Sequence, residues 1–397
     1  MSTQQPQFLT LLLLVSFGSV GATLFTPGLP MIAHYFQVNM ASAQLTITLF
    51  LIGYAVGQLL YGPLTNRFGR KPTLYYAIGL EIISALLCSF AAPLHSFDLL
   101  VVARLLMALG ASVGLKMTFT IIADSYPQDQ ATHIISRLLL AFAITPGLGI
   151  TIGGYLVELL NWQSCFYFLA LYGVLLLFLC MRLPETSKKL DHTALYLSSL
   201  IKNYYLQIKN SQLVLCAVMV GCASTFIYLF AALAPFIAMN LLQMDPAHYG
   251  LFNLLPPLGM IAGSFLAAHL ARSVLPLKAI IVGIIISCLG ALLMLGAFLV
   301  HWINPYTLFL PMAVSYVGLS VIFANASGLA TSQATDKSNA SAMMNFLNMG
   351  FCVVCVLLAG LMTKHAAIIM PIIYCGLILI LYILYHFLKP TSSAAKA

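Results

Sequence analysis

The sequence predicts an all-α membrane protein with twelve transmembrane helices arranged as two six-helix bundles. Of its 397 residues, 61% are hydrophobic and only 7% are charged, which is more apolar surface than a water-soluble domain can bury. Polar interruptions divide the chain into twelve apolar runs of the length that crosses a hydrocarbon layer of about 30 Å as a helix. The longest polar interruption follows the sixth run, so we expect six spans on each side of it.

The apolar runs end at charges, prolines and polar clusters. They cover residues 8–33, 43–66, 72–92, 98–123, 136–159, 164–183, 212–240, 248–270, 277–299, 306–330, 341–363 and 369–388. The N-terminus lacks the basic residues of a cleavable signal, so we expect the first run to be retained as a span. The predicted domains are an N-terminal bundle at 1–185, a linker at 186–211 and a C-terminal bundle at 212–397. The linker's apolar residues and lysines recur at helical spacing, which favours an interfacial amphipathic helix over an ordinary solvated linker.

The positive charge of the chain is distributed asymmetrically. The net charge is +8, and all of the 17 lysines and arginines except Arg104, Lys116 and Lys364 lie at or beyond span ends on one side of the predicted membrane. By the positive-inside rule, that side and both termini are cytoplasmic, as in a multi-pass protein of a bacterial inner membrane. This pattern indicates contact with anionic membrane lipids and excludes a nucleic-acid partner. We expect a monomer that binds a small-molecule substrate.

The cysteines indicate neither a disulfide framework nor a metal site. Nearly all of the nine lie within apolar runs, where cysteine behaves as a small hydrophobic residue. The pair Cys352 and Cys355 has CxxC spacing but no histidine or acid beside it. We therefore expect no bound metal, no cofactor and no catalytic residues, and the protein is not predicted to be an enzyme.

Two motifs carry a resemblance to a known family. The stretch GQLLYGPLTNRFGRKP at 57–72 combines a glycine for close helix approach with a tight basic turn. It resembles the loop between the second and third helices of the major facilitator superfamily, and PGLG at 146–149 with the glycines at 153–154 resembles the fifth-helix motif of its export-type members. The resemblance implies two pseudosymmetric bundles that work by alternating access. It assigns a gating motif to Gly62, Asn66, Arg67, Gly69, Arg70, Lys71 and Asp124, and a helix 5 motif to Pro146, Gly149, Gly153 and Gly154.

Three further stretches, at 23–36, 233–240 and 338–349, look like the Bcr/CflA-type branch of drug:proton antiporters. The likeness breaks at Thr23, where exporters of that branch usually carry an acid. It also breaks at Asn66, where the loop usually has an aspartate. The resemblance thus implies the fold without implying the usual proton site or recognition of cations.

The fourth span places Arg104 and Lys116 in a helix that lines the cavity in this superfamily. A charge inside the membrane costs at least about 2.5–3.5 kcal/mol, so each is a candidate functional residue. The alternatives are that Arg104 hydrogen-bonds helix carbonyls and that Lys116 extends to the membrane interface. Polar residues on other spans could orient a substrate, although such residues often only join helices. The predicted substrate-binding residues are Arg104, Lys116, Tyr54, Gln58, Tyr228, Asn325 and Asn345.

Acidic residues are few, and two of them receive predicted roles. Glu81 is near the middle of the third span and is the candidate proton site, with a packed, neutral or hydrogen-bonded side chain as the alternative. Asp124 ends the fourth span, where we expect it to pair with Arg67 or Arg70 and close the inward gate. A plain surface ion pair is the alternative for Asp124.

These features predict a secondary active transporter. No G-x-x-x-x-G-K-[ST] loop is present, so the energy source is expected to be a proton gradient or the membrane potential. A positive cavity favours export of an anionic or zwitterionic metabolite, for example a carboxylate siderophore. The alternatives are a multidrug:proton antiporter, an importer of amino acids or organic acids, and a membrane sensor or scaffold that transports nothing.

Overall fold

The computed structural model describes residues 6–187, 190–191, 194–196, 204–332, 337–362 and 366–388. Across these ranges it is a helical protein without strands. Twelve of the described helices are long and apolar enough to cross a membrane, which confirms the predicted spans. Their bounds are Phe8–Tyr35, Met40–Phe68, Arg70–Phe90, Phe97–Ser125, Phe142–Leu159, Gln163–Met181, Ser211–Leu241, Pro246–Leu270, Pro276–Leu299, Pro305–Ser332, Asn339–Leu361 and Ala367–Leu388.

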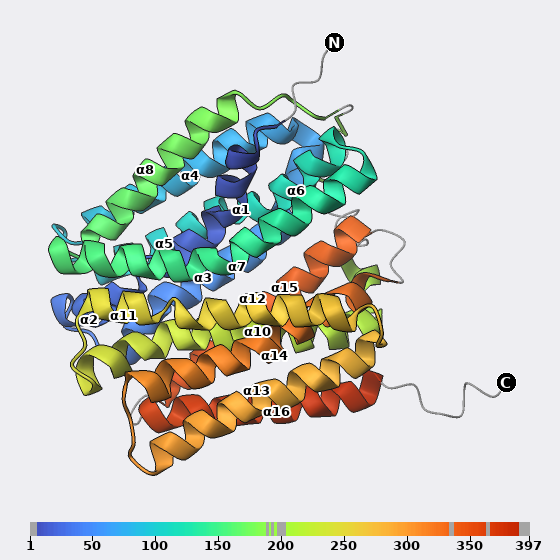
Figure 1. Cartoon of the computed structure of the whole chain (residues 1–397). Coiled ribbons are helices and arrows are strands. Elements are labelled where there is room, and N and C mark those ends of the chain that lie inside the picture. Colours follow the sequence, from blue (N-terminus) through green and yellow to red (C-terminus); the bar gives the residue numbers. More distant parts are fainter. Residues whose placement is uncertain are drawn as a thin grey trace, which may run out of the picture. The chain divides into compact units, whose positions relative to one another are not determined.

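The helices follow one another along the chain as labelled in Figure 1. They are α1 (Phe8–Thr23), η1 (Thr26–Gly28), α2 (Leu29–Tyr35), α3 (Met40–Phe68), α4 (Arg70–Phe90), α5 (Phe97–Ala111), α6 (Val113–Ser125), α7 (Gln128–Leu159), α8 (Gln163–Met181), α10 (Ser211–Phe236), η2 (Ile237–Leu241), α11 (Pro246–Phe252), α12 (Leu255–Leu270), α13 (Pro276–Leu299), α14 (Pro305–Ser332), α15 (Lys337–Leu361) and α16 (Ala366–Leu388).

Several spans are broken, and the breaks have local causes. The first span changes from α1 through a short 3-10 turn to α2 around Pro27, because proline cannot donate the hydrogen bond that a continuous helix needs. The fourth span is interrupted at Ser112, between α5 and α6. The seventh ends in the π-helical turn η2. Each break frees backbone carbonyls, which side chains from other helices can then bind.

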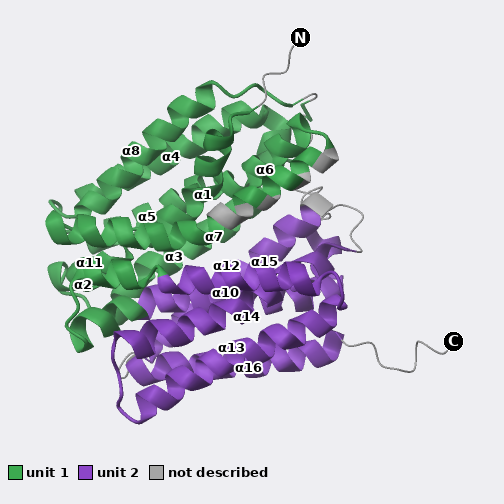
Figure 2. Cartoon of the chain, viewed as in Figure 1, with its two compact units in different colours: residues 1–203, 234–254 green, residues 204–233, 255–397 purple. Residues whose placement is uncertain are grey.

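The chain forms two compact units, which Figure 2 colours separately. Unit 1 contains residues 1–203 and 234–254, and unit 2 contains residues 204–233 and 255–397. The short segment 234–254, with η2 and α11, therefore groups with the helices of the first six spans. The division of the sequence at 186–211 stays a prediction. Most of the amphipathic helix expected there lies outside the described residues, although residues 204–208 are helical.

The fourth span has a central position in unit 1 because glycines let its neighbours approach closely. A Cβ on Gly53 of α3 would lie 2.3 Å from the carbonyl oxygen of Leu105, and one on Gly110 would lie 2.5 Å from that of Ala77 on α4. A Cβ on Gly114 would lie 2.2 Å from the carbonyl oxygen of Leu14 on α1. None of these glycines can gain a side chain without moving a backbone, so small residues fix the helix spacing.

The tenth span, α14, has the corresponding position in unit 2. Gly259 and Gly263 of α12 pack against its Ala313 and Val317, and Gly283 of α13 packs against its Gly318. A Cβ on each of these three glycines would lie only 2.0–2.7 Å from a carbonyl oxygen of α14. Each unit thus has one central span, and glycines allow the neighbouring helices to pack closely against it.

Candidate functional site

The predicted gating motif forms a polar network at the end of unit 1 that we expect to be cytoplasmic. Of the two arginines offered by the sequence as partners of Asp124, Arg70 makes the ion pair, with 3.0 Å between its Nε and the carboxylate. Arg70 also donates to the Thr65 carbonyl and to the Ser187 hydroxyl. Thr186 donates to the same oxygen of Asp124 at 2.9 Å. The network therefore joins α3, α4 and α6 to the segment that follows α8.

Glu185 completes this network by capping α4. The first backbone N–H groups of a helix lack partners within it, and here those of Arg70 and Lys71 donate to the two oxygens of Glu185 at 3.0 and 2.9 Å. The preceding Gly69 has φ of +94°, and a Cβ there would lie 2.9 Å from Glu185. The carboxylate is thus held at the positive end of the α4 dipole. No local sequence pattern predicts this role for Glu185, because the residues that it joins are far apart in the chain.

We predict that Glu185→Ala destabilises the protein more than Asp124→Asn does. The alanine variant loses the acceptor of two helix N–H groups and of the Ser187 N–H, which is expected to cost about 1–2 kcal/mol. The Asp124–Arg70 pair is partly exposed, so its loss is expected to cost about 0–1 kcal/mol. Melting temperatures in detergent compare the two variants, and a larger loss for Asp124→Asn would contradict the capping role.

Arg104 is completely buried, with 0% of its surface exposed. Its Nη1 donates to the Gly21 carbonyl at 2.7 Å and its Nε to the Thr46 carbonyl at 3.1 Å. Gly21 lies in the last turn of α1, where carbonyls need partners and a cation is favourable. The guanidinium also lies 4.0 and 4.2 Å from the ring centres of Phe25 and Phe50. The two hydrogen bonds are those expected if Arg104 has a structural role and binds helix carbonyls. Substrate binding by Arg104 stays a prediction.

Glu81 is the acid within electrostatic range of Arg104. It is 1% exposed, and neither carboxyl oxygen has a hydrogen-bond partner in the part of the chain that the structure describes. Gly110 of α5 and Gly173 of α8 pack directly against it, since a Cβ on either would come within 3 Å of Glu81 atoms. A carboxyl group without hydrogen bonds in so apolar a position is costly unless it is neutral or balanced by a nearby positive charge.

The other predicted ligands of unit 1 lie around the break in the fourth span. Gln58 donates to the carbonyl of Ser112 at the break, at 3.3 Å. Tyr54 is 9% exposed and fits against Gly18 of α1, where a Cβ would come within 2.6 Å of the ring. Lys116 is half-buried one turn beyond the break, with its Nζ beside Gly62 of α3. The structure therefore brings Tyr54, Gln58 and Lys116 to one region of α3 and α6.

The remaining predicted ligands, Tyr228, Asn325 and Asn345, lie on three helices of unit 2. They belong to α10, α14 and α15, and all three are half-buried. Asn325 donates to the Val321 carbonyl of its own helix at 2.9 Å, an interaction that anchors the amide. Their contact with a substrate stays a prediction.

The helix 5 motif lies on α7 and makes close backbone contacts on two faces. A Cβ on Gly153 would lie 1.7 Å from the Leu24 carbonyl at the end of α1. One on Gly154 would lie 2.3 Å from the Pro246 carbonyl at the start of α11. Along the same contact with α11, Thr151 donates to the Gly250 carbonyl and Glu158 accepts from the Ala247 N–H, both at 2.8 Å. The motif therefore joins α7 both to the first span and to the segment 234–254.

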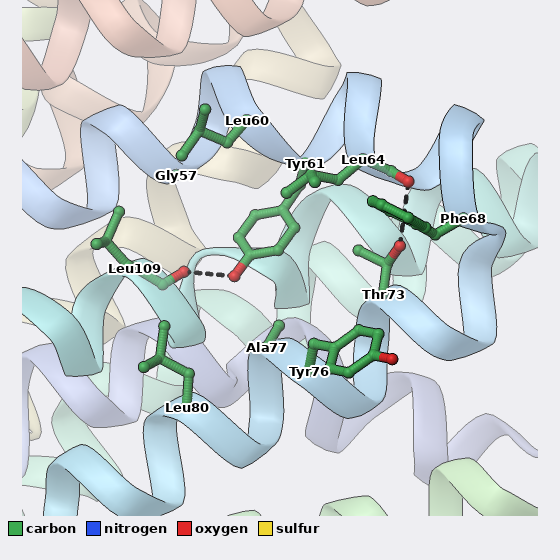
Figure 3. A pocket seen from close by; sticks show the side chains of 10 residues that line it. All are labelled: Gly57, Leu60, Tyr61, Leu64, Phe68, Thr73, Tyr76, Ala77, Leu80 and Leu109. Carbon is green, nitrogen blue, oxygen red and sulfur yellow. Dashed lines mark hydrogen bonds between the residues drawn. The ribbon is translucent and has the colours of Figure 1, made fainter. Parts of the chain in front are cut away.

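A groove of about 450 Å³ lies between α3, α4 and α5 and is shown in Figure 3. Two of its polar side chains are engaged with carbonyls: Tyr61 donates to Leu109 at 2.8 Å and Thr73 to Leu64 at 3.3 Å. The rest of its lining is mainly apolar and includes the exposed Leu60. None of the predicted substrate ligands lines this groove.

Comparisons with known proteins agree with this arrangement. The model of the Major Facilitator Superfamily matches residues 11–357. A protein named as an uncharacterized transporter of Rickettsia bellii is 30% identical over 79% of this chain and 78% of its own length. A bicyclomycin resistance protein homolog of Haemophilus influenzae is 26% identical over 67% of this chain and 66% of its own. Multidrug resistance protein D of Escherichia coli is 31% identical over 45% of each.

A solved structure has the same fold. The D-xylose-proton symporter superposes with a TM-score of 0.76 over 94% of this chain and 96% of its own, at 16% identity. With the family model spanning most of the sequence and the twelve spans in place, the chain belongs to the major facilitator superfamily and is a multi-pass membrane transporter, not an enzyme.

Proposed function

We propose that the protein exports small organic molecules from the cytoplasm by proton-linked alternating access, as a multidrug-type exporter of a bacterial inner membrane with both termini cytoplasmic. The relatives named for bicyclomycin and multidrug resistance support this proposal. The structural observation that carries it is the glycine face of α7, since the motif at Pro146–Gly154 resembles that of export-type members. Its glycines lie directly against α1 and α11. A helix that packs closely in one state of the transport cycle and separates in another needs such a face without side chains.

The environment of Arg104 changes the expected substrate. From its place in the sequence, this charge is predicted to lie in a cavity, which favours an anionic substrate. In the structure, two phenyl rings and two helix carbonyls enclose the guanidinium, which leaves less positive charge to attract an anionic substrate. Broad recognition of lipophilic molecules is therefore the first proposal.

An anionic or zwitterionic metabolite, such as a carboxylate siderophore, is the second candidate. Thr23 favours it, because the acid that usually recognises cations in this branch is replaced by a hydroxyl that donates to the Ser19 carbonyl at 2.8 Å. Lys116 adds a half-buried positive charge. Competition of lipophilic cations and of carboxylates for the same efflux distinguishes the two candidates.

The direction of transport is tested by measuring drug efflux from intact bacteria that lack their own major drug exporters. Cells expressing the protein are expected to lose a preloaded fluorescent drug faster than cells with an empty vector, and a protonophore should remove the difference. Faster uptake of amino acids or organic acids, with unchanged drug efflux, would support an importer and contradict the proposal.

For proton coupling we propose Glu81, a buried acid within electrostatic range of Arg104. We predict that Glu81→Gln retains substrate exchange but loses the acceleration that an imposed pH gradient gives to the wild type, because glutamine cannot exchange a proton. The matched control is Asp98→Asn, which changes an exposed acid at the start of α5. A full response to the gradient in the Glu81→Gln protein would exclude this residue as the proton carrier.

A further inference from the structure

A second pocket of unit 1 is lined by an unusual set of side chains. It has a volume of about 430 Å³ and is lined by Met31, His34, Met239 and Met244, together with the aromatic residues Tyr35 and Trp162. Three thioethers and one imidazole around a single space are candidate ligands for a metal ion. No local sequence motif marks this site, because these residues come from two segments that are distant along the chain.

Local backbone geometry brings the four side chains together. Met31 and His34 are three residues apart on α2, a spacing that puts them on the same helix face. Met239 lies in the π-helical turn η2, a type of turn that often occurs at functional sites. The chain then reverses at Gln243, which has φ of +54°, and the Met244 N–H donates to the Ala238 carbonyl at 2.9 Å. This reversal returns Met244 to the turn that carries Met239.

The aromatic wall of the pocket is held in place by its own contacts. The Tyr35 ring stacks on His95 at 5.4 Å and meets Trp162 edge-on at 5.7 Å. Its hydroxyl donates to the Ala92 carbonyl at 3.0 Å. The imidazole of His34, in contrast, has no hydrogen-bond partner among the residues that the structure describes, and Met31 is 42% exposed. The candidate ligands are therefore available beside a fixed wall.

The chemistry of this set selects a soft monovalent cation. Thioether sulfur is an uncharged, polarizable donor that prefers Cu(I), and imidazole also suits copper. No carboxylate lines the pocket, so the anionic oxygen ligands that magnesium and calcium require are missing from it. We infer that Met31, His34, Met239 and Met244 form a binding site for Cu(I). A bound ion would link α2 of the first span to the η2 segment of the seventh. The inference does not depend on the proposed export function.

The test is a titration of the full-length protein in detergent with Ag(I), a soft monovalent ion that resists redox change. Accessible thiols are first blocked with N-ethylmaleimide, because Cys288, Cys355 and Cys375 are only partly buried and would bind the ion. Calorimetry should then show about one tightly bound equivalent. A rise in melting temperature should accompany it, since an ion that binds only the folded protein stabilises it.

The variant that tests the site combines Met31→Leu with Met239→Leu, which preserves side-chain volume closely. Without metal, this variant should melt like the wild type. It should bind Ag(I) at least about tenfold more weakly, because changing even the residues that hydrogen-bond to metal ligands lowers metal affinity about 10–100-fold. The control is Met181→Leu, an exposed methionine of α8 outside the pocket, which should bind as the wild type does. Absence of a saturable equivalent in the thiol-blocked wild type, or an unchanged affinity in the double variant, would overturn the inference.

Discussion

Arg104→Ala is expected to lower the free energy of unfolding by about 3–5 kcal/mol, since two buried carbonyls lose their donor at about 1–3 kcal/mol each and a cavity opens where the guanidinium was. The Gly21 and Thr46 carbonyls lose a charged donor. The rings of Phe25 and Phe50 face a cavity, and Glu81 loses the nearby positive charge. We expect little folded protein in the membrane and a much lower melting temperature in detergent. Arg182→Ala, which removes an exposed arginine of the same unit, should change stability by less than about 0.5 kcal/mol.

Two further variants separate the contributions at this position. Arg104→Lys keeps the charge but loses the planar group that stacks between the phenyl rings, so its stability should fall between those of the wild type and the alanine variant. Adding Glu81→Gln to Arg104→Ala should recover part of the loss, because the amide carries no charge to be neutralised. Wild-type melting of Arg104→Ala would show that the buried contacts do not hold the first, second and fourth spans together.

Gly153→Ala and Gly154→Ala are expected to have the next largest effects. Each new methyl group would overlap a backbone carbonyl, that of Leu24 at 1.7 Å for Gly153 and that of Pro246 at 2.3 Å for Gly154. Backbone atoms at helix ends cannot move aside as a flexible side chain can, so overpacking of this kind is expected to cost about 1–3 kcal/mol or more. Efflux should fall as well, since α7 could no longer pack closely against α1 or α11.

The matched control for both variants is Gly79→Ala on α4, where a Cβ would have no atom within 4 Å. Alanine is favoured over glycine in a helix by about 0.5–1 kcal/mol, so this change should be neutral or slightly stabilising. Thermal melting and drug efflux are measured for all three variants. Equal melting temperatures for Gly153→Ala and Gly79→Ala would contradict the close contact between α7 and α1.

Much of the fold could be predicted from the sequence because the membrane imposes it. A span needs about 20 apolar residues, and the twelve runs therefore marked the twelve helices closely. The partners of Asp124 could be narrowed to Arg67 and Arg70 because the loop motif fixes their place at one end of the bundle. In this case the resemblance supplied a tertiary contact that composition alone could not.

The environments of individual side chains could not be predicted in the same way. Phe25 and Phe50 enclose Arg104 from two other spans, and no local pattern marks that contact. The capping of α4 by Glu185 joins residues far apart in the chain, and the grouping of 234–254 with unit 1 depends on glycine contacts along α7. These features arise from packing between distant segments, which hydrophobic periodicity does not report.

The most direct test of proton-linked export is transport by the purified protein in proteoliposomes with an acidic lumen. We expect the gradient, with the lumen more acidic than the medium, to drive a lipophilic drug into the lumen above its external concentration. A protonophore should abolish this accumulation, and Glu81→Gln should show only equilibration. Accumulation by the wild type that is the same with and without the gradient would contradict the account.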